Sequence, residues 1–137
     1  MADFTKINSF VEALAEKVHN LGSDTLKIAL TNTAHTSTWD QLADLTLASG
    51  APANLDTVTI VTSSSAQTSG TYKLVLDDLT MTASGAVGPF RYVYVYNDTA
   101  TGDDLIAYYD YGSSIELASG DTFTVNFDGT NGFLTIA

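Results

Sequence analysis

The sequence contains no cysteine and only two prolines in its 137 residues. Without cysteine the fold uses no disulfide bonds, and a thiolate nucleophile or a zinc site built on cysteine is excluded. No apolar run approaches the roughly 20 residues that a membrane-spanning helix requires. The amino terminus carries acidic Asp3 and no hydrophobic signal core, so we expect synthesis in a cytoplasm without classical secretion.

Basic residues are also scarce, with five Lys and Arg against sixteen Asp and Glu, which gives a formal net charge of −11. A field of that sign repels phosphate backbones and anionic lipids. We therefore expect neither a nucleic acid nor a membrane as partner. Many of the aspartates cluster at turns, which favours a solvated surface over an acidic binding face.

What the chain does contain is apolar and aromatic: 45% of its residues are hydrophobic, and there are seven Tyr and six Phe. That much apolar surface offsets the entropy lost on ordering the chain, which excludes a disordered protein. A chain of this length forms one domain and buries roughly two-thirds of the surface that its unfolded form exposes.

One amphipathic helix is predicted near the amino terminus, from about Ile7 to Leu21. Its apolar positions recur at helical spacing, at Phe10, Leu14, Val18 and Leu21. Ser9 and Glu12 have the spacing of a capping box, Asp3 is an alternative start, and Gly22 is a suitable stop. A helix this short is not stable alone, so we expect it to pack on a sheet or on a neighbouring subunit.

From Thr25 onward the apolar period becomes two, as in half-buried strands. The central segment is Phe90 to Tyr96, in which three tyrosines alternate with Val93 and Val95. Successive strand side chains point to opposite faces, so both faces of this strand are suited to burial.

Turn-forming residues divide the rest of the chain into short strands every 8–12 residues or so. This pattern predicts an all-β fold, an antiparallel β-sandwich of jelly-roll type with about eight or nine strands and one short N-terminal α-helix. Residues 1–24 are the predicted helical segment and residues 25–137 the sandwich, in a single domain overall. The turn at residues 128–132 predicts a hairpin at the carboxyl terminus. Residues 32–56 form a long connection in which Trp39 is expected to anchor the loop to the core.

No arrangement of residues in the sequence indicates catalysis. His19, expected to be mostly exposed near the end of the helix, and His35 have no partner at catalytic or metal-ligand spacing. The oxygen-rich stretch from Asn97 to Asp104 fails the calcium-loop template, because Ala100 and Gly102 stand at ligand positions. We therefore predict no enzyme activity, no metal and no cofactor. Arg91 is hypothesised to pair with a carboxylate across the sheet or on a neighbour.

The seven tyrosines admit two interpretations, a face that stacks sugars or a core and subunit interface. Their regular alternation along strands favours core or interface, where tyrosine supplies a large area and a polar tip. The sugar-binding reading stays open as the alternative.

A resemblance to a known family covers nearly the whole chain, and it rests on four ordered blocks: Phe10–Lys27, Ala29–Thr33, Thr68–Leu74 and Gly88–Tyr92. In these blocks the chain resembles small virion proteins of tailed bacteriophages that are encoded among head genes. Residues 35–57 depart from that pattern, because the Gly- and Tyr-rich segment often found there in the family is degenerate here.

The resemblance implies a capsid decoration or cement protein, a jelly-roll oligomer that clamps neighbouring capsomers from outside. The implied partners are the phage major capsid protein and further copies of the chain, as a dimer or a trimer, and the implied location is the outer surface of the capsid. A receptor- or glycan-binding module of a tail fibre or head surface is the alternative. Candidate residues for the capsid or subunit interface are Phe10, Leu14, Val18, His35, Trp39, Arg91, Tyr92 and Tyr96.

Overall fold

The computed structural model describes residues 2–137, and 47% of the chain is strand against 7% helix. In chain order the elements are β1 (Asp3–Lys6), α1 (Phe10–Ala15), β2 (Leu26–Thr31), the 3₁₀ helix η1 (Leu42–Asp44), β3 (Thr62–Thr68), β4 (Thr71–Leu76), β5 (Leu79–Thr82), β6 (Val87–Asn97), β7 (Leu105–Leu117), β8 (Thr122–Val125) and β9 (Leu134–Ile136). The predicted all-β class with antiparallel sheets and one short helix is confirmed.

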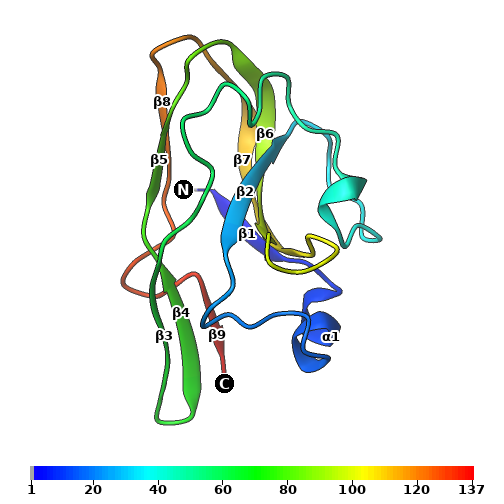
Figure 1. Ribbon diagram of the computed structural model, residues 1–137, viewed down its shortest axis with the longest axis vertical. Coiled ribbons are helices and arrows are strands. Elements are labelled where there is room, and N and C mark those ends of the chain that lie inside the picture. Colours follow the sequence, from blue (N-terminus) through cyan, green and yellow to red (C-terminus); the bar gives the residue numbers. More distant parts are fainter. Residues whose placement is uncertain (1) are drawn as a thin grey trace.

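The strands form two layers, which Figure 1 shows side by side. One layer is a four-stranded sheet in the order β1-β7-β6-β2, and the other combines the sheets β3-β4-β9 and β5-β8. All strand pairs are antiparallel. The order within the sheets does not by itself establish a jelly roll, and that finer assignment stays a prediction.

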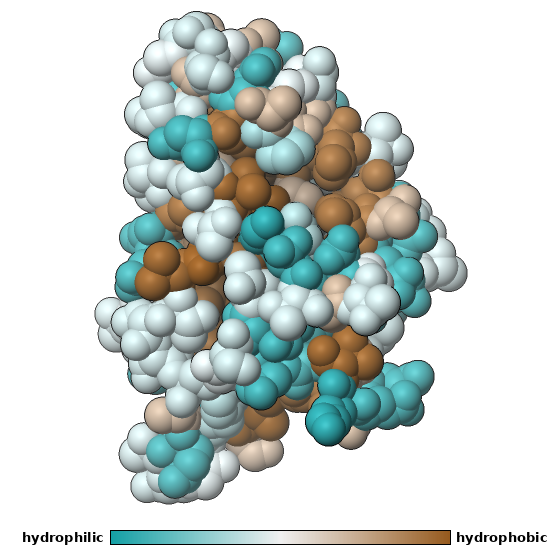
Figure 2. Space-filling view, viewed as in Figure 1, coloured by the Kyte–Doolittle hydropathy of each residue, from teal (hydrophilic) through white to brown (hydrophobic). Residues whose placement is uncertain are grey.

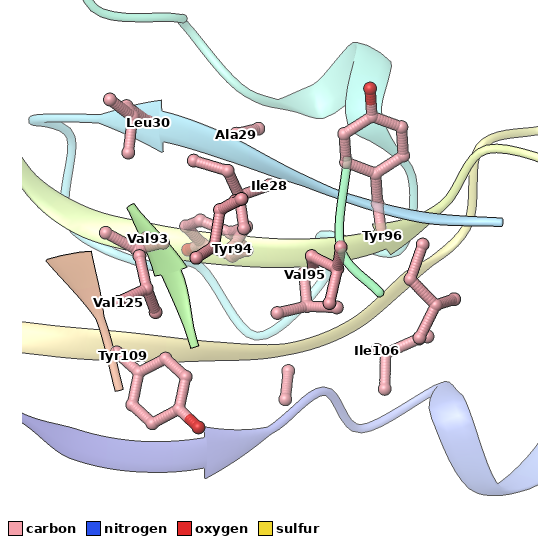
Figure 3. Packing of buried hydrophobic residues seen from close by; sticks show 14 of the residues in the cluster. Ile28, Ala29, Leu30, Val93, Tyr94, Val95, Tyr96, Ile106, Tyr109 and Val125 are labelled. Atoms are coloured by element: carbon pink, nitrogen blue, oxygen red, sulfur yellow. The ribbon is translucent and has the colours of Figure 1, made fainter. Parts of the chain in front are cut away.

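The aromatic strand β6 lies inside the four-stranded sheet, between β7 and β2. Its side chains from Tyr92 to Tyr96 are at most 8% exposed, so both faces are covered as the alternation predicts. On the inner face, Val93 lies near Val125 of β8 (Figure 3). On the outer face, Tyr96 points toward the loop that carries η1 (Figure 3).

The long connection after β2 is an ordered cover for the outer face of the sheet. The Ala48 amide donates a hydrogen bond to the Leu30 carbonyl at 2.8 Å, and a β-bridge joins Thr31 to Leu47. Leu45 is buried. Packing of this loop leaves a small apolar cavity of about 80 Å³ between the loop and β2.

The first 24 residues differ from the prediction. Residues 3–6 form an edge strand of the main sheet, so this part of the chain is not a purely helical segment. The helix covers Phe10–Ala15 only, because Lys17 adopts a left-handed conformation (φ 69°) that ends it five residues before Gly22. Ser9 is the N-cap residue but makes no side-chain capping bond, so the capping box is absent.

The predicted hairpin at the carboxyl terminus is also wrong. β8 pairs with β5, whereas β9 pairs with β4, so the turn at residues 128–132 carries the chain from one sheet to another. Residues 62–68, whose composition suggests a loop or weak strand ends, form the full strand β3.

Candidate functional site

An aromatic cluster, formed by His35, Trp39, Tyr92, Tyr94 and Tyr108, occupies the outer face of the four-stranded sheet. The His35 ring stacks on Tyr108 with centroids 4.6 Å apart, and Tyr108 stacks on Tyr94 at 5.0 Å. Trp39 meets His35 edge-on at 5.7 Å. The long loop thus anchors itself on the sheet through His35 and Trp39, as predicted for Trp39.

One hydrogen bond joins two members of the aromatic cluster. The Tyr94 hydroxyl and His35 Nδ1 are 2.8 Å apart. Burial raises the pKa of the Tyr94 phenol and lowers the pKa of His35, so at pH 7 both groups are neutral and share this hydrogen bond. Among residues 2–137 no carboxylate hydrogen-bonds to His35, so within that range the pair lacks the orienting acid of a catalytic triad.

Arg91 forms the ion pair hypothesised for it. Its Nε and Nη2 atoms bind the two carboxylate oxygens of Asp110 on β7 at 2.8 and 3.1 Å. The guanidinium carbon also lies 5.3 Å from the centroid of the Tyr92 ring. The hydrogen bonds from Arg91, and secondly the one from the Gly112 amide, hold the pKa of Asp110 below its usual value. This pair fixes one border of the aromatic cluster.

The candidate interface residues separate into two groups in space. His35, Trp39 and Tyr92 belong to the aromatic cluster, and Arg91 lies at its border. Tyr96 lies further along the same face, beside η1 (Figure 3). Tyr92 and Tyr96 are each only 8% exposed, so most of the accessible surface of this group belongs to the other three. The remaining candidates, Phe10, Leu14 and Val18, lie at a different place on the molecule.

The second place is an apolar groove of about 770 Å³. We call this groove, together with the exposed side chains around it, the open side. It lies where the edge strands β1 and β9 of the two layers flank α1. Figure 2 shows brown, apolar surface in the regions of α1 and β9. The residues that line the groove are Phe4, Lys6, Phe10, Val11, Leu14, Ile106, Asn131, Gly132, Phe133, Leu134, Thr135 and Ile136.

Several exposed apolar side chains gather at the open side. Phe4 is 42% exposed, Val11 56% and Ile136 39%, and these are three of the six exposed large hydrophobic residues in the part of the chain described. Val18, 37% exposed, lines a neighbouring hollow that shares Leu14 with the groove. A contiguous apolar patch rimmed by polar residues is typical of a protein contact surface.

His19, expected on an exposed helical turn, is instead 5% exposed and follows the helix. The Asn97 side chain donates hydrogen bonds from Nδ2 to His19 Nδ1 at 2.9 Å and to Asp24 Oδ2 at 2.6 Å. Its Oδ1 atom accepts from the amides of Thr99 and Ala100. This Asn97 network ties the turn after β6 to the segment before β2. Sequence spacing missed it because its members are far apart along the chain.

Stability should fall as the pH falls through the range in which His19 titrates. Because Nδ1 accepts from Asn97, the neutral ring carries its proton on Nε2, which is buried without a partner. Burial lowers the pKa of His19 below its usual 6.5, although Asp104 and Asp24 oppose the shift. The unfolded chain therefore binds the proton more readily, so the contribution of neutral His19 is complete above pH 6.5 and is lost below it.

The measurement is the melting temperature of wild type and of His19→Asn between pH 7.5 and 5. Asparagine keeps an acceptor at the Nδ1 position and does not titrate, so we expect a flatter pH dependence for this variant. His35, whose pKa burial also lowers, contributes a slope in the same direction and is removed in a parallel His35→Asn variant. Equal slopes for wild type and His19→Asn would contradict the assignment.

Several oxygens of the loop from Asn97 to Asp104 are engaged by other groups of the protein. Asp98 pairs with the Lys27 ammonium at 3.2 Å, and the Asp104 carbonyl accepts from the Asn97 amide at 2.9 Å. Within residues 2–137, no group of three or more His, Cys, Asp or Glu side chains is arranged to hold a metal ion. Over the same residues, no helix is long and apolar enough to cross a membrane.

Comparisons with known proteins found no matching family model, no matching curated protein and no matching solved structure.

Proposed function

We propose that the protein is a non-enzymatic structural component of a tailed-phage virion, which binds the outside of the capsid and cements neighbouring coat subunits. The observation that carries the proposal is the division of its contact residues between two separate surfaces, the aromatic cluster with its loop and the open side. A protein that joins other subunits needs at least two such surfaces, whereas an enzyme needs one site with reactive groups.

The charge of the chain is consistent with this role. A net charge of −11 gives an outer-shell protein no attraction for the packaged genome. In this proposal the protein is made in the bacterial cytoplasm and is found on the outer capsid surface, with the major capsid protein as its partner.

The receptor- or glycan-binding alternative has weaker support. Stacking on a sugar requires an exposed aromatic ring, but Tyr92, Tyr94 and Tyr96 are 8%, 0% and 8% exposed. The central tyrosines of the chain thus serve its own packing. Binding of the purified protein to a glycan array, without binding to capsids, would favour this alternative.

Capsids of the phage that encodes the protein should lose integrity at a lower temperature when the protein is absent. Binding to the assembled shell stabilises it by mass action, by about 2.7 kcal/mol per site at a free concentration of roughly a hundred times Kd. The measurement is release of packaged DNA during a thermal ramp, on particles with and without the protein. Adding the purified protein back should restore the higher release temperature.

Two variants of the protein distinguish specific binding to the capsid from a nonspecific effect of added protein. Trp39→Ala, which truncates the half-buried side chain that anchors the loop, should weaken rebinding to the particles. Val61→Ala, at a residue 60% exposed and outside both surfaces, should bind as wild type does. Identical release temperatures with and without the wild-type protein would refute the proposed function.

A further inference from the structure

Strand β1 is an edge of the main sheet. It pairs with β7 on one side only, and all four of its side chains, from Asp3 to Lys6, are exposed. An uncovered edge presents backbone N–H and C=O groups to whatever strand approaches it. β1 has neither a proline nor a bulge, so its outward backbone groups are free to pair, and its protection is limited to its four-residue length and the charges of Asp3 and Lys6.

The direction of each backbone group along β1 follows from one hydrogen bond. The Ile7 amide donates to the Ile106 carbonyl of β7 at 3.0 Å, in the same register as the β1–β7 ladder. Backbone groups alternate in direction along an antiparallel strand, so those of Asp3 and Thr5 also point toward β7. The N–H and C=O groups of Phe4 and Lys6 therefore point away from the sheet.

We infer that a second copy of the chain pairs with this edge, β1 against β1 in antiparallel orientation, with Thr5 on the two-fold axis. Phe4 and Lys6 stand symmetrically on either side of Thr5. In this register Phe4 of one copy lies opposite Lys6 of the other, and all four outward groups of each strand find partners. An axis through Phe4 or Lys6 would instead place the other residue opposite a position outside β1.

The charges of the open side permit this contact between two acidic chains. Lys6 is the only charged residue among those that line the groove, and no Asp or Glu lines it. Phe4 and Lys6 project from the same face of β1, because they are two residues apart. The pairing therefore brings each Lys6 ammonium to the Phe4 ring of the other copy, where a cation and an aromatic ring attract one another.

The apolar rim of the open side supplies the rest of the interface. A stable contact buries about 800 Å² per partner, which a four-residue strand does not reach alone. A two-fold axis perpendicular to the sheet sets the two open sides next to each other, so that exposed Phe4, Val11 and Ile136 are covered in the same event. We expect a dimer with a dissociation constant on the order of micromolar.

This inference deepens the proposed function and rests on it for its biological meaning. A dimer carries two aromatic-cluster surfaces, one per copy, and so can hold two coat subunits at once. Joining two binding sites in one particle raises the overall affinity through effective concentration.

A single introduced cysteine tests the register directly, because the chain has no other cysteine. Thr5→Cys places two thiols at a directly opposed pair, where Cα atoms are about 4.5 Å apart in the non-hydrogen-bonded position. Mild oxidation should give a disulfide-linked dimer on a non-reducing gel. Asp3→Cys is the matched control. In the proposed register the two introduced cysteines lie about 14 Å apart along the paired strands, which is too far for a disulfide. Failure of Thr5→Cys to cross-link, or equal cross-linking of Asp3→Cys, would overturn the register.

The non-covalent dimer is measured by sedimentation equilibrium over roughly 1–200 µM chain, a range that brackets a micromolar dissociation constant. Lys6→Pro removes one outward N–H and leaves the bonds to β7 intact, as proline on an edge strand does. It should weaken the dimer at least tenfold relative to Lys6→Ala, with melting curves verifying that both variants are folded. A wild-type chain that stays monomeric at 200 µM, or Lys6→Pro that associates as tightly as Lys6→Ala, would refute the dimer.

The same preparations separate this inference from the proposed function. A monomeric wild-type chain that still raises the release temperature of capsids would refute the dimer and leave the cement role standing. A wild-type chain that dimerises but does not change the release temperature of capsids would support the β1–β1 pairing and refute the cement role.

Discussion

Replacing Tyr94 by alanine should unfold much of the protein before it affects any contact selectively. The Tyr94 ring is fully buried and stacks on Tyr108. Truncating a buried aromatic side chain to alanine costs about 3–5 kcal/mol, which is comparable to the whole stability of many domains of this size. Urea denaturation followed by circular dichroism measures the loss.

Tyr94→Phe is the matched variant, because it keeps the ring and removes only the hydroxyl that hydrogen-bonds to His35. Its expected cost is about 1 kcal/mol, the net value of one hydrogen bond. If Tyr94→Ala were stably folded and had lost capsid binding, the central strand would itself be part of the contact surface, contrary to the assignment of Tyr94 to the core.

Replacing Asn97 by aspartate should be nearly as damaging at neutral pH. The Asn97 side chain is fully buried, and its Nδ2 donates to both His19 and Asp24. Aspartate has no donor when ionised and would place a second carboxylate against Asp24. An unpaired buried charge of this kind costs about 3–5 kcal/mol. Thermal denaturation at pH 7 gives the difference from wild type.

The control is Asn32→Asp, because Asn32 is exposed and accepts only a surface hydrogen bond from Ser114. A surface substitution of this kind changes stability by about 0.5 kcal/mol or less. Equal melting temperatures for the two variants would show that the Asn97 network contributes little to the folded state.

The parts of the fold that sequence reasoning predicted are those with a strong local pattern. Alternation places Tyr92 to Tyr96 in a strand buried on both faces, and these residues are buried. The scarcity of basic residues draws attention to Arg91, and the structure pairs it with Asp110. Each signal lies within a few residues of the chain and needs no knowledge of the tertiary structure.

The parts that were missed depend on partners far away in sequence. β1 is four residues long, and all four of its side chains are exposed. It therefore shows no alternation of buried and exposed residues, and it is recognised as a strand only from its pairing with β7. The turn at residues 128–132 predicts that β9 pairs with the strand just before it, but β9 pairs with β4, which is far earlier in the sequence. His19 has helical spacing, but the left-handed residue Lys17 ends the helix before it.

The candidate site divides in the same way. Candidate residues on both surfaces are predicted from the sequence. The sequence does not indicate, however, that Phe10 and Leu14 lie apart from His35 and Trp39. That separation is set by the order β1-β7-β6-β2, which puts α1 beside the β1 edge and the long loop over β6. Strand order is a property of long-range pairing, and local periodicity does not contain it.

The length of the central strand pair has a mechanical consequence. β6 and β7 run beside each other from the pair Val87–Leu117 to the pair Tyr96–Leu105. Hydrogen bonds in an antiparallel pair lie perpendicular to the strands, so a force along the strands loads them together, whereas a force across the sheet peels them one after another. The protein should thus resist stretching most strongly along the axis of β6. In the proposed cement role, a swelling shell would be restrained best where that axis follows the direction of strain.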